Sequence, residues 1–179
     1  MRVIAFGHQK KVGKDTATRL LVTELRMSRI NALDIGFADK VKDVSYQMYS
    51  YMGLKPRLYY EQHPDAKDIQ LPGYHITPRD IWIHVGNKGR EIDENCWIYN
   101  ALSDIKADVI VIRDLRFCNE ANHLLEKYGA TRIKLEREGV PIGTDPAEID
   151  MLNFVGWTKI IQNNGTLAEL RVNVLEALK

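Results

Sequence analysis

The residues that could do chemistry first appear near the start of the chain, in residues 7–16, which read GHQKKVGKDT. This stretch is close to the phosphate-binding pattern G-x-x-x-x-G-K-[ST], but five residues separate its glycines, and His8 stands where the pattern has its first glycine. The second half of the pattern, Gly13 followed by Lys14, is intact. Backbone N–H groups at the start of a helix and a lysine ammonium group together bind phosphate. The stretch therefore predicts a site for nucleotide phosphates.

Side chains next to Gly13 extend this prediction to a metal ion. Asp15 has no hydroxyl group, but a carboxylate in the first turn of a helix can hold Mg²⁺, and Thr16 supplies a hydroxyl one position later. Lys10 adds positive charge for a substrate phosphate, and Lys14 is the expected catalytic lysine. The alternative is an ordinary turn in which Asp15 is the N-cap of a helix. The expected ATP-binding residues of the loop are Val12, Gly13, Lys14, Asp15 and Thr16.

Strands and helices alternate along the rest of the chain and must position this loop. The hydrophobic pattern predicts strands at 2–6, 32–37, 108–112, 130–135 and 158–162. It predicts helices at 15–28, from 39, from 77 to Gly86 or Gly89, and at 94–106, 119–127 and 167–178. Such alternation indicates an α/β protein with a parallel sheet of about five strands, the three-layer fold of P-loop NTPases.

Two segments show no clear periodicity of hydrophobic residues. Residues 53–73 read as a loop or a short helical excursion, and residues 136–150 read as a functional flap, or lid.

Composition narrows the choice of partners. The chain has 179 residues, 25 of them basic and 24 acidic, so its net charge of +1 gives no field that would attract nucleic acid or a membrane surface. The two cysteines lack metal-ligand spacing, which favours reduced thiols in a soluble cytoplasmic protein. The five histidines form no zinc motif. We expect one domain, residues 1–179, with no nucleic-acid or membrane partner.

Five sequence blocks occur in order and span nearly the whole chain: GKDT at 13–16, FADKVKD at 37–43, TPRDIWIHVGNKGREIDENCWI at 77–98, IRDLRFCNEA at 112–121 and IIQNNGTLAEL at 160–170. Together they resemble the bacteriophage deoxynucleoside monophosphate kinases, P-loop enzymes related in fold to dephospho-coenzyme A kinase. The sequence departs from the family at His8, where the family loop usually begins with glycine, and at residues 145–148, where a histidine followed by serine-glutamate is common.

The resemblance implies transfer of a phosphoryl group from ATP, with Mg²⁺, to a deoxynucleoside monophosphate (dNMP). The product is the diphosphate used for DNA precursors, and the expected compartment is the cytoplasm, of the host if the protein is viral. The acceptor would bind to about 39–98 under a lid at about 136–150. The sequence leaves the preferred base open, and the oligomeric state too, a homodimer included.

The resemblance also implies roles for residues of the acceptor region. Arg79 and Arg90 would bind the monophosphate, because a guanidinium group binds phosphate oxygens in pairs. Trp82 would stack on the base. Asp39 would orient the acceptor or metal-bound water as a catalytic residue, with helix N-capping as the alternative. The alternatives for the arginines and Trp82 are surface ion pairs and packing.

Further residues are expected around the phosphates. Arg116 follows the strand at 108–112, where ligands gather in open α/β sheets, and is expected to bind substrate. Asp114 is a weaker candidate for a metal-binding acid and could instead pair with Arg116. By the resemblance, Arg137 at the root of the lid would be catalytic, with a solvated charge as the alternative, and Glu148 would bind substrate. Asn164 and Gly165 would border the adenine.

Two other functions stay open. One is a kinase of the dephospho-coenzyme A type, in which Asp39 would deprotonate a sugar hydroxyl. The other is a regulatory module that binds ATP without turnover.

Overall fold

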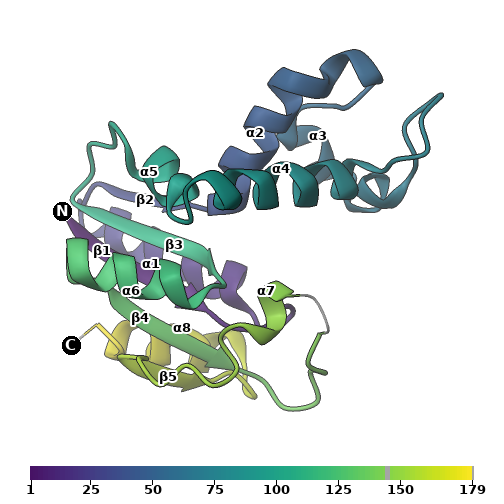
Figure 1. Ribbon diagram of the computed structural model, residues 1–179. Coiled ribbons are helices and arrows are strands. Elements are labelled where there is room, and N and C mark those ends of the chain that lie inside the picture. Colours follow the sequence, from purple (N-terminus) through teal and green to yellow (C-terminus); the bar gives the residue numbers. More distant parts are fainter. Residues whose placement is uncertain (144–145, 179) are drawn as a thin grey trace. The chain divides into compact units, whose positions relative to one another are not determined.

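The computed structural model describes residues 1–143 and 146–178. The chain forms two compact units (Figure 1). Unit 1 comprises Met1–Gly36 and Asp104–Lys179, and unit 2 is the continuous segment Phe37–Ser103. The acceptor-binding region expected at about 39–98 falls within unit 2.

Unit 1 is built on a five-stranded parallel sheet with the order β2-β3-β1-β4-β5. The expected α/β class and parallel sheet are confirmed, and the arrangement is consistent with a P-loop-like three-layer fold. The strands are β1 (Arg2–Gly7), β2 (Ala32–Ile35), β3 (Val109–Leu115), β4 (Thr131–Glu136) and β5 (Lys159–Gln162).

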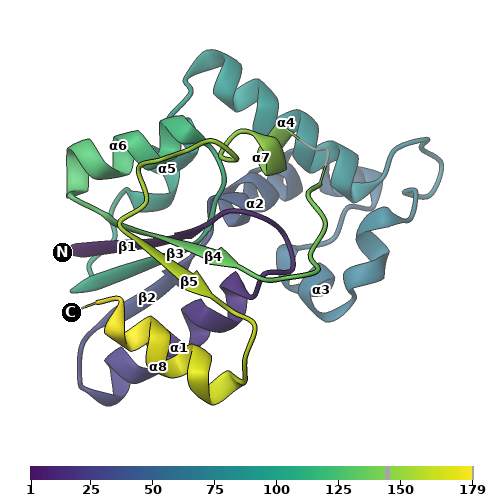
Figure 2. The same cartoon turned by 90° about the horizontal axis from the view of Figure 1, so that it is seen from below.

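Helices cover both faces of this sheet. Figure 2 shows α1 (Lys14–Met27) and α8 (Leu167–Glu176) on one face and α6 (Cys118–Tyr128) on the other. Side chains alternate between the two faces along a strand, so Ile133 and Leu135 of β4 face the core shared with α1 and α8. Arg132, Lys134 and Glu136 therefore point to the opposite face.

The order of the strands fixes where a site can form. The connection from β1 through α1 to β2 runs one way along the sheet, and the connection from β3 through α6 to β4 runs the other way. Right-handed crossovers in opposite directions place α1 and α6 on opposite faces, which leaves a crevice beyond the carboxyl ends of β1 and β3. The loop at 8–13, which has two lysines and ends in Gly13, follows β1 at this edge.

Unit 2 is helical and has a small core of its own, formed by Leu54, Tyr60, Leu71 and Ile81. The segment 53–73 contains the expected short helical excursion, here α3 and η2. The elements of unit 2 are α2 (Phe37–Tyr49), η1 (Ser50–Met52), α3 (Arg57–Gln62), η2 (Pro64–Asp68), α4 (Pro78–Ile92) and α5 (Cys96–Leu102).

Helix α4 confirms the expected start and corrects the expected end. Thr77 and Asp80 form a reciprocal capping box, as their spacing predicts. The helix does not stop at Gly86 or Gly89. Gly89 makes room for Trp97, because a Cβ there would lie 2.8 Å from the indole ring, and the indole N–H donates to the Gly86 carbonyl at 2.9 Å.

Three other expectations change in detail. β3 extends three residues past Ile112, to Leu115, so Asp114 lies within the strand. α2 begins at Phe37, which puts Asp39 in its first turn and not at its N-cap. The expected lid contains α7 (Pro146–Ile149), and its residues Thr144 and Asp145 lie outside the described part of the chain. Among the described residues, no helix has the length and apolar character needed to cross a membrane.

Candidate functional site

The loop after β1 is shaped by three residues in the left-handed region: His8 with φ 85°, Lys11 with φ 63° and Gly13 with φ 102°. A non-glycine residue in this region loses roughly 1–2 kcal/mol, so the loop retains a conformation that glycine adopts more easily. Successive residues that combine right- and left-handed conformations can turn backbone N–H groups toward a common point, which is the geometry of a concave anion site. His8 therefore occupies the place of the first pattern glycine in conformation as well as in sequence.

Gly13 is required for packing as well as for its dihedral angle. It is the N-cap of α1, and a Cβ on it would lie 2.4 Å from Nδ2 of Asn163. That amide group donates to the carbonyl of Val12 at 2.8 Å and is buried beyond the end of β5. Because Gly13 is the N-cap, Asp15 lies in the first helical turn, where its charge suits the helix dipole. The alternative of Asp15 as an N-cap is wrong.

Lys14 is turned inward and is only 6% exposed. Its ammonium group donates to the carbonyl of His8 at 2.9 Å and to the carbonyl of Gln9. Burial lowers the pKa of Lys14 to about 8, and the neighbouring Arg116 contributes to lowering this pKa, against the opposing effect of Glu148. An anion bound beside Lys14 would favour its charged form.

Glu148 connects three elements of unit 1. Its side chain is 1% exposed, and Arg116, which follows β3, donates from Nη1 to Oε1. The other oxygen, Oε2, accepts from the backbone N–H of Lys10 at 2.7 Å, and Nζ of Lys10 lies 3.8 Å from Oε1. The structure thus brings together Lys10, Arg116 and Glu148, all expected to bind substrate, next to Lys14.

The residues expected to hold a metal ion are Asp15 and Thr16, at the start of α1. Asp15 is exposed and Thr16 is partly buried. No group of three or more His, Cys, Asp or Glu residues that would hold a metal by itself occurs in the described residues. Magnesium in phosphoryl-transfer sites binds through one or two protein groups and completes its shell with phosphates and water. The carboxylate and the hydroxyl of these two residues fit that donor set.

The sequence did not predict the surroundings of His8, which include the charged pair Lys134 and Glu136. His8 is buried, and its pKa is lowered by burial and by Lys134, while Glu136 acts in the opposite direction. Lys134 pairs with Glu136 at 2.5 Å, and Gln162 of β5 donates to the same carboxylate at 2.5 Å. Nδ1 of His8 has no hydrogen-bond partner among the described residues. The alternation of Arg132, Lys134 and Glu136 along β4 was the available signal.

The remaining expected residues of unit 1 lie at the carboxyl ends of β4 and β5. Arg137 follows β4 and is exposed. Asn164 accepts from the backbone N–H of Glu138 at 2.9 Å, which connects the loop after β5 to the root of the expected lid. Gly165 packs closely on Glu169, since a Cβ there would lie 2.2 Å from a carboxylate oxygen. These three residues lie at the same edge of the sheet as the loop.

The expected acceptor residues are all in unit 2. Asp39 forms an ion pair with Arg57 at 3.3 Å. Arg79 binds both oxygens of Asp68, through Nε at 2.5 Å and Nη2 at 3.0 Å. The described residues of unit 2 therefore show Asp39 and Arg79 in separate ion pairs.

The other two acceptor candidates lie further along α4. Trp82 packs edge-on against Tyr60, with 5.1 Å between ring centroids, and the ammonium group of Lys42 lies 5.4 Å from its ring. Arg90 is partly buried in the last turn of the helix. These contacts agree with the alternative for Trp82, in which it is a packing residue.

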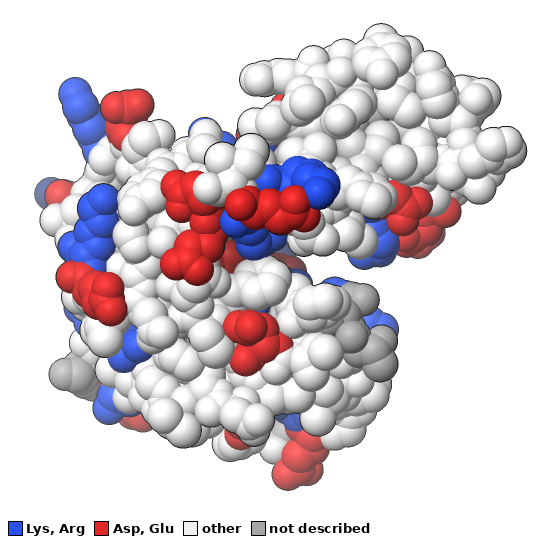
Figure 3. All heavy atoms as spheres, in the orientation of Figure 1, with Lys and Arg blue, Asp and Glu red and all other residues white. Residues whose placement is uncertain are grey.

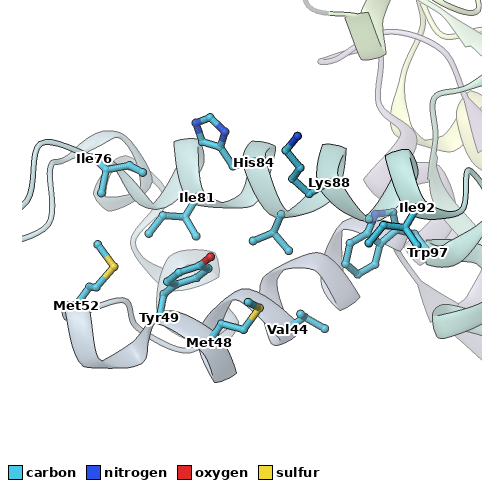
Figure 4. A pocket seen from close by; sticks show the side chains of 12 residues that line it. Val44, Met48, Tyr49, Met52, Ile76, Ile81, His84, Lys88, Ile92 and Trp97 are labelled. Atoms are coloured by element: carbon cyan, nitrogen blue, oxygen red, sulfur yellow. The ribbon is translucent and has the colours of Figure 1, made fainter.

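An apolar groove on unit 2 was not anticipated. It has a volume of about 450 Å³ and runs between α2 and α4 (Figure 4). Met48, Tyr49 and Ile81 line it, and Trp97 closes one end. In the view of Figure 3, the upper right part of the molecule presents mostly uncharged side chains, and charged side chains gather along its lower edge.

Two comparisons with known proteins found no match. No protein-family model matches the chain, and no curated protein matches it.

Proposed function

We propose that this chain is a P-loop phosphotransferase that moves the γ-phosphoryl group of ATP to a dNMP. The observation that supports this best is the environment of Lys14: a buried ammonium group under a loop with three left-handed residues, beside Arg116. Phosphoryl transfer depends mainly on positioning and on neutralising charge, and this edge of the sheet concentrates backbone donors and cations for that purpose.

On the donor side, the loop N–H groups and the start of α1 would hold the β- and γ-phosphates. Lys14 would leave the carbonyls of His8 and Gln9 for phosphate oxygens, which are stronger acceptors because they are charged. Mg²⁺ held by Asp15 and Thr16 would neutralise charge on the phosphates. Arg116 would bind the phosphoryl group or the acceptor phosphate, and Arg137 would approach it from the lid.

On the acceptor side, Arg79 and Arg90 would bind the monophosphate. The double contact of Arg79 with Asp68 uses the geometry with which a guanidinium group also binds phosphate. A nucleoside monophosphate has a second pKa near 6, so it is largely ionised at neutral pH and needs no base to become a nucleophile. The ion pair of Asp39 with Arg57 suits an orienting role under this scheme.

The test is an assay of ADP release with ATP, Mg²⁺ and each of the common dNMPs, followed by identification of the product by mass. We expect ADP release that depends on one or more dNMPs and falls at least about 100-fold in Lys14→Met. Lys11→Met is the matched control, because Lys11 is an exposed lysine of the same loop. Folded protein that releases no ADP with any dNMP would exclude this function. A phosphorylated dephospho-coenzyme A would instead assign the hydroxyl-acceptor reaction.

A further inference from the structure

Glu148 is an unusual residue to find at a phosphate site, because it brings a negative charge to the donors that an anion needs. Its carboxylate is buried and uses both oxygens, one for the N–H of Lys10 and one for the guanidinium group of Arg116. The ammonium group of Lys10 is 3.8 Å away, and Lys14 is close enough for Glu148 to affect its pKa. These are a loop amide, a guanidinium group and two ammonium groups, the donors that also bind phosphate.

Within α7 itself, Glu148 is the residue that anchors the helix. Of the four residues of α7, only Glu148 is buried. Packing near it is tight, since a Cβ on Gly143 would lie 2.9 Å from Cγ of Glu148. Just after the helix, the carboxylate of Asp150 accepts from the N–H of Cys118 at 2.6 Å. After the helix, Met151 is buried, at 2% exposed, and holds the chain there by apolar packing. The contacts that hold α7 itself are those of Glu148, and an incoming anion can replace them.

We propose that Glu148 is an internal competitor for phosphate: its carboxylate occupies the phosphate donors in the ligand-free protein, and a bound phosphate displaces it and releases α7. This inference rests on the proposed function, because the displacing phosphate is that of the nucleotide or of the acceptor. It adds a regulatory step to that function. The carboxylate offsets part of the positive charge of Lys10, Lys14 and Arg116 when the site is empty, and a ligand must supply enough negative charge to replace it.

Hydrogen–deuterium exchange on the wild-type chain tests the displacement without any substitution. The probe is inorganic pyrophosphate at pH 7.5. We expect it to slow amide exchange at 8–16, where it binds, and to speed exchange at 146–152, where α7 is released. Slower or unchanged exchange at 146–152 with protection at 8–16 would overturn the proposal. A lack of protection at 8–16 with saturating pyrophosphate would overturn it as well.

Calorimetric titration of variants tests the competition. Glu148→Gln keeps the shape of the side chain and removes its charge, so we expect pyrophosphate to bind at least about tenfold more tightly than to the wild type. Glu138→Gln removes the same charge from an exposed position of the same connection and is expected to bind as the wild type does. If Glu148 only positions Arg116 for substrate, Glu148→Gln binds equally or more weakly, and the proposal fails. If the variant does not fold, the exchange experiment decides.

The two readouts separate this inference from the proposed function. Opposite exchange responses at the two segments in a chain that phosphorylates no dNMP would support the competition and reject the kinase. Turnover of a dNMP together with protection of both segments would support the kinase and reject the competition.

Discussion

The side-chain amide of Asn163 donates to the carbonyl of Val12 at 2.8 Å and lies where a Cβ on Gly13 would stand. Asn163, just after β5, thus holds the loop in place through this hydrogen bond. The contact is possible because Gly13 has no side chain. The loop conformation, and the phosphate site proposed on it, depend on this contact.

Gly13→Ala should therefore damage the loop in two ways. The left-handed φ of 102° strains any side chain, and the new Cβ would meet Nδ2 of Asn163 at 2.4 Å. We expect a loss of more than about 3 kcal/mol in the free energy of unfolding, or a rearranged loop without ATP binding. Denaturant titration and ATP titration measure the two effects.

Gly129→Ala is the matched control for this substitution. Gly129 also has a positive φ, 59°, but among the described residues no neighbouring atom lies within 4 Å of the point that its Cβ would occupy. It should lose only about 1–2 kcal/mol, because the strain is present and the collision is not. Equal losses in the two variants would show that Asn163 does not constrain the loop.

A second prediction concerns the proton on Lys14. Its pKa of about 8 lies below the usual 10.5, mainly because of burial. A bound triphosphate restores a negative charge beside it and raises the pKa, so ATP binding should take up close to one proton at about pH 9 and almost none at pH 7. Calorimetry in buffers of different ionisation enthalpy measures this uptake.

ATP binding takes up protons, and does not release them, because the charge of Lys14 differs between the free and the bound protein. In the free protein at pH 9 most of the side chain is neutral, and in the complex it is charged. Lys14→Arg removes the uptake, since arginine stays charged at all these pH values, while Lys11→Arg should keep it. Binding heats at pH 9 that do not vary with the buffer would contradict the prediction.

The sequence predicted the parts of this site that follow from local pattern. An apolar run, a glycine-lysine pair and a helical period were enough to place Lys14 at the start of α1, after β1. The alternation of strands and helices predicted the parallel sheet, because parallel strands need crossover connections. Arg116 was placed at the right edge for the same reason.

Contacts between residues far apart in the sequence could not be predicted from local pattern. Glu148 is 32 residues from Arg116 and 138 from Lys10, and Asn163 is 151 residues from Val12. No local periodicity reports which of several carboxylates or amides reaches the loop. The groove of unit 2 was missed because it depends on how α2 and α4 pack against each other.

A third prediction concerns His8 and acid. Its pKa is lowered by burial, Lys134 and Lys14, more than Glu136 and Glu148 raise it, so folding favours the neutral ring. The stability that comes from the neutral ring is present above the usual pKa of 6.5 and is lost as the pH falls through the lower folded value. The melting temperature should therefore fall more between pH 7.5 and 5 in the wild type than in His8→Gln.

The control for this comparison is His75→Gln, a substitution at an exposed histidine of unit 2. Its melting curve against pH should follow that of the wild type. If the His8→Gln curve runs parallel to both, the ring of His8 does not contribute to the acid sensitivity of the fold.

A fourth prediction uses Asp39 to identify the acceptor chemistry. Asp39 and Asp43 both contact Arg57, at 3.3 Å and 3.5 Å, so Asp39→Asn and Asp43→Asn each remove one carboxylate from the same guanidinium group. With a phosphate acceptor no proton has to be removed, and Asp39→Asn should lower kcat by less than about tenfold. With a hydroxyl acceptor the loss of a general base would lower kcat by about 10²–10⁴.

Steady-state kinetics on both variants distinguishes a phosphate acceptor from a hydroxyl acceptor. Asp43→Asn is the control, because it shows the effect of disturbing Arg57 alone. A kcat loss of the larger size in Asp39→Asn alone would move the assignment to a hydroxyl-phosphorylating kinase.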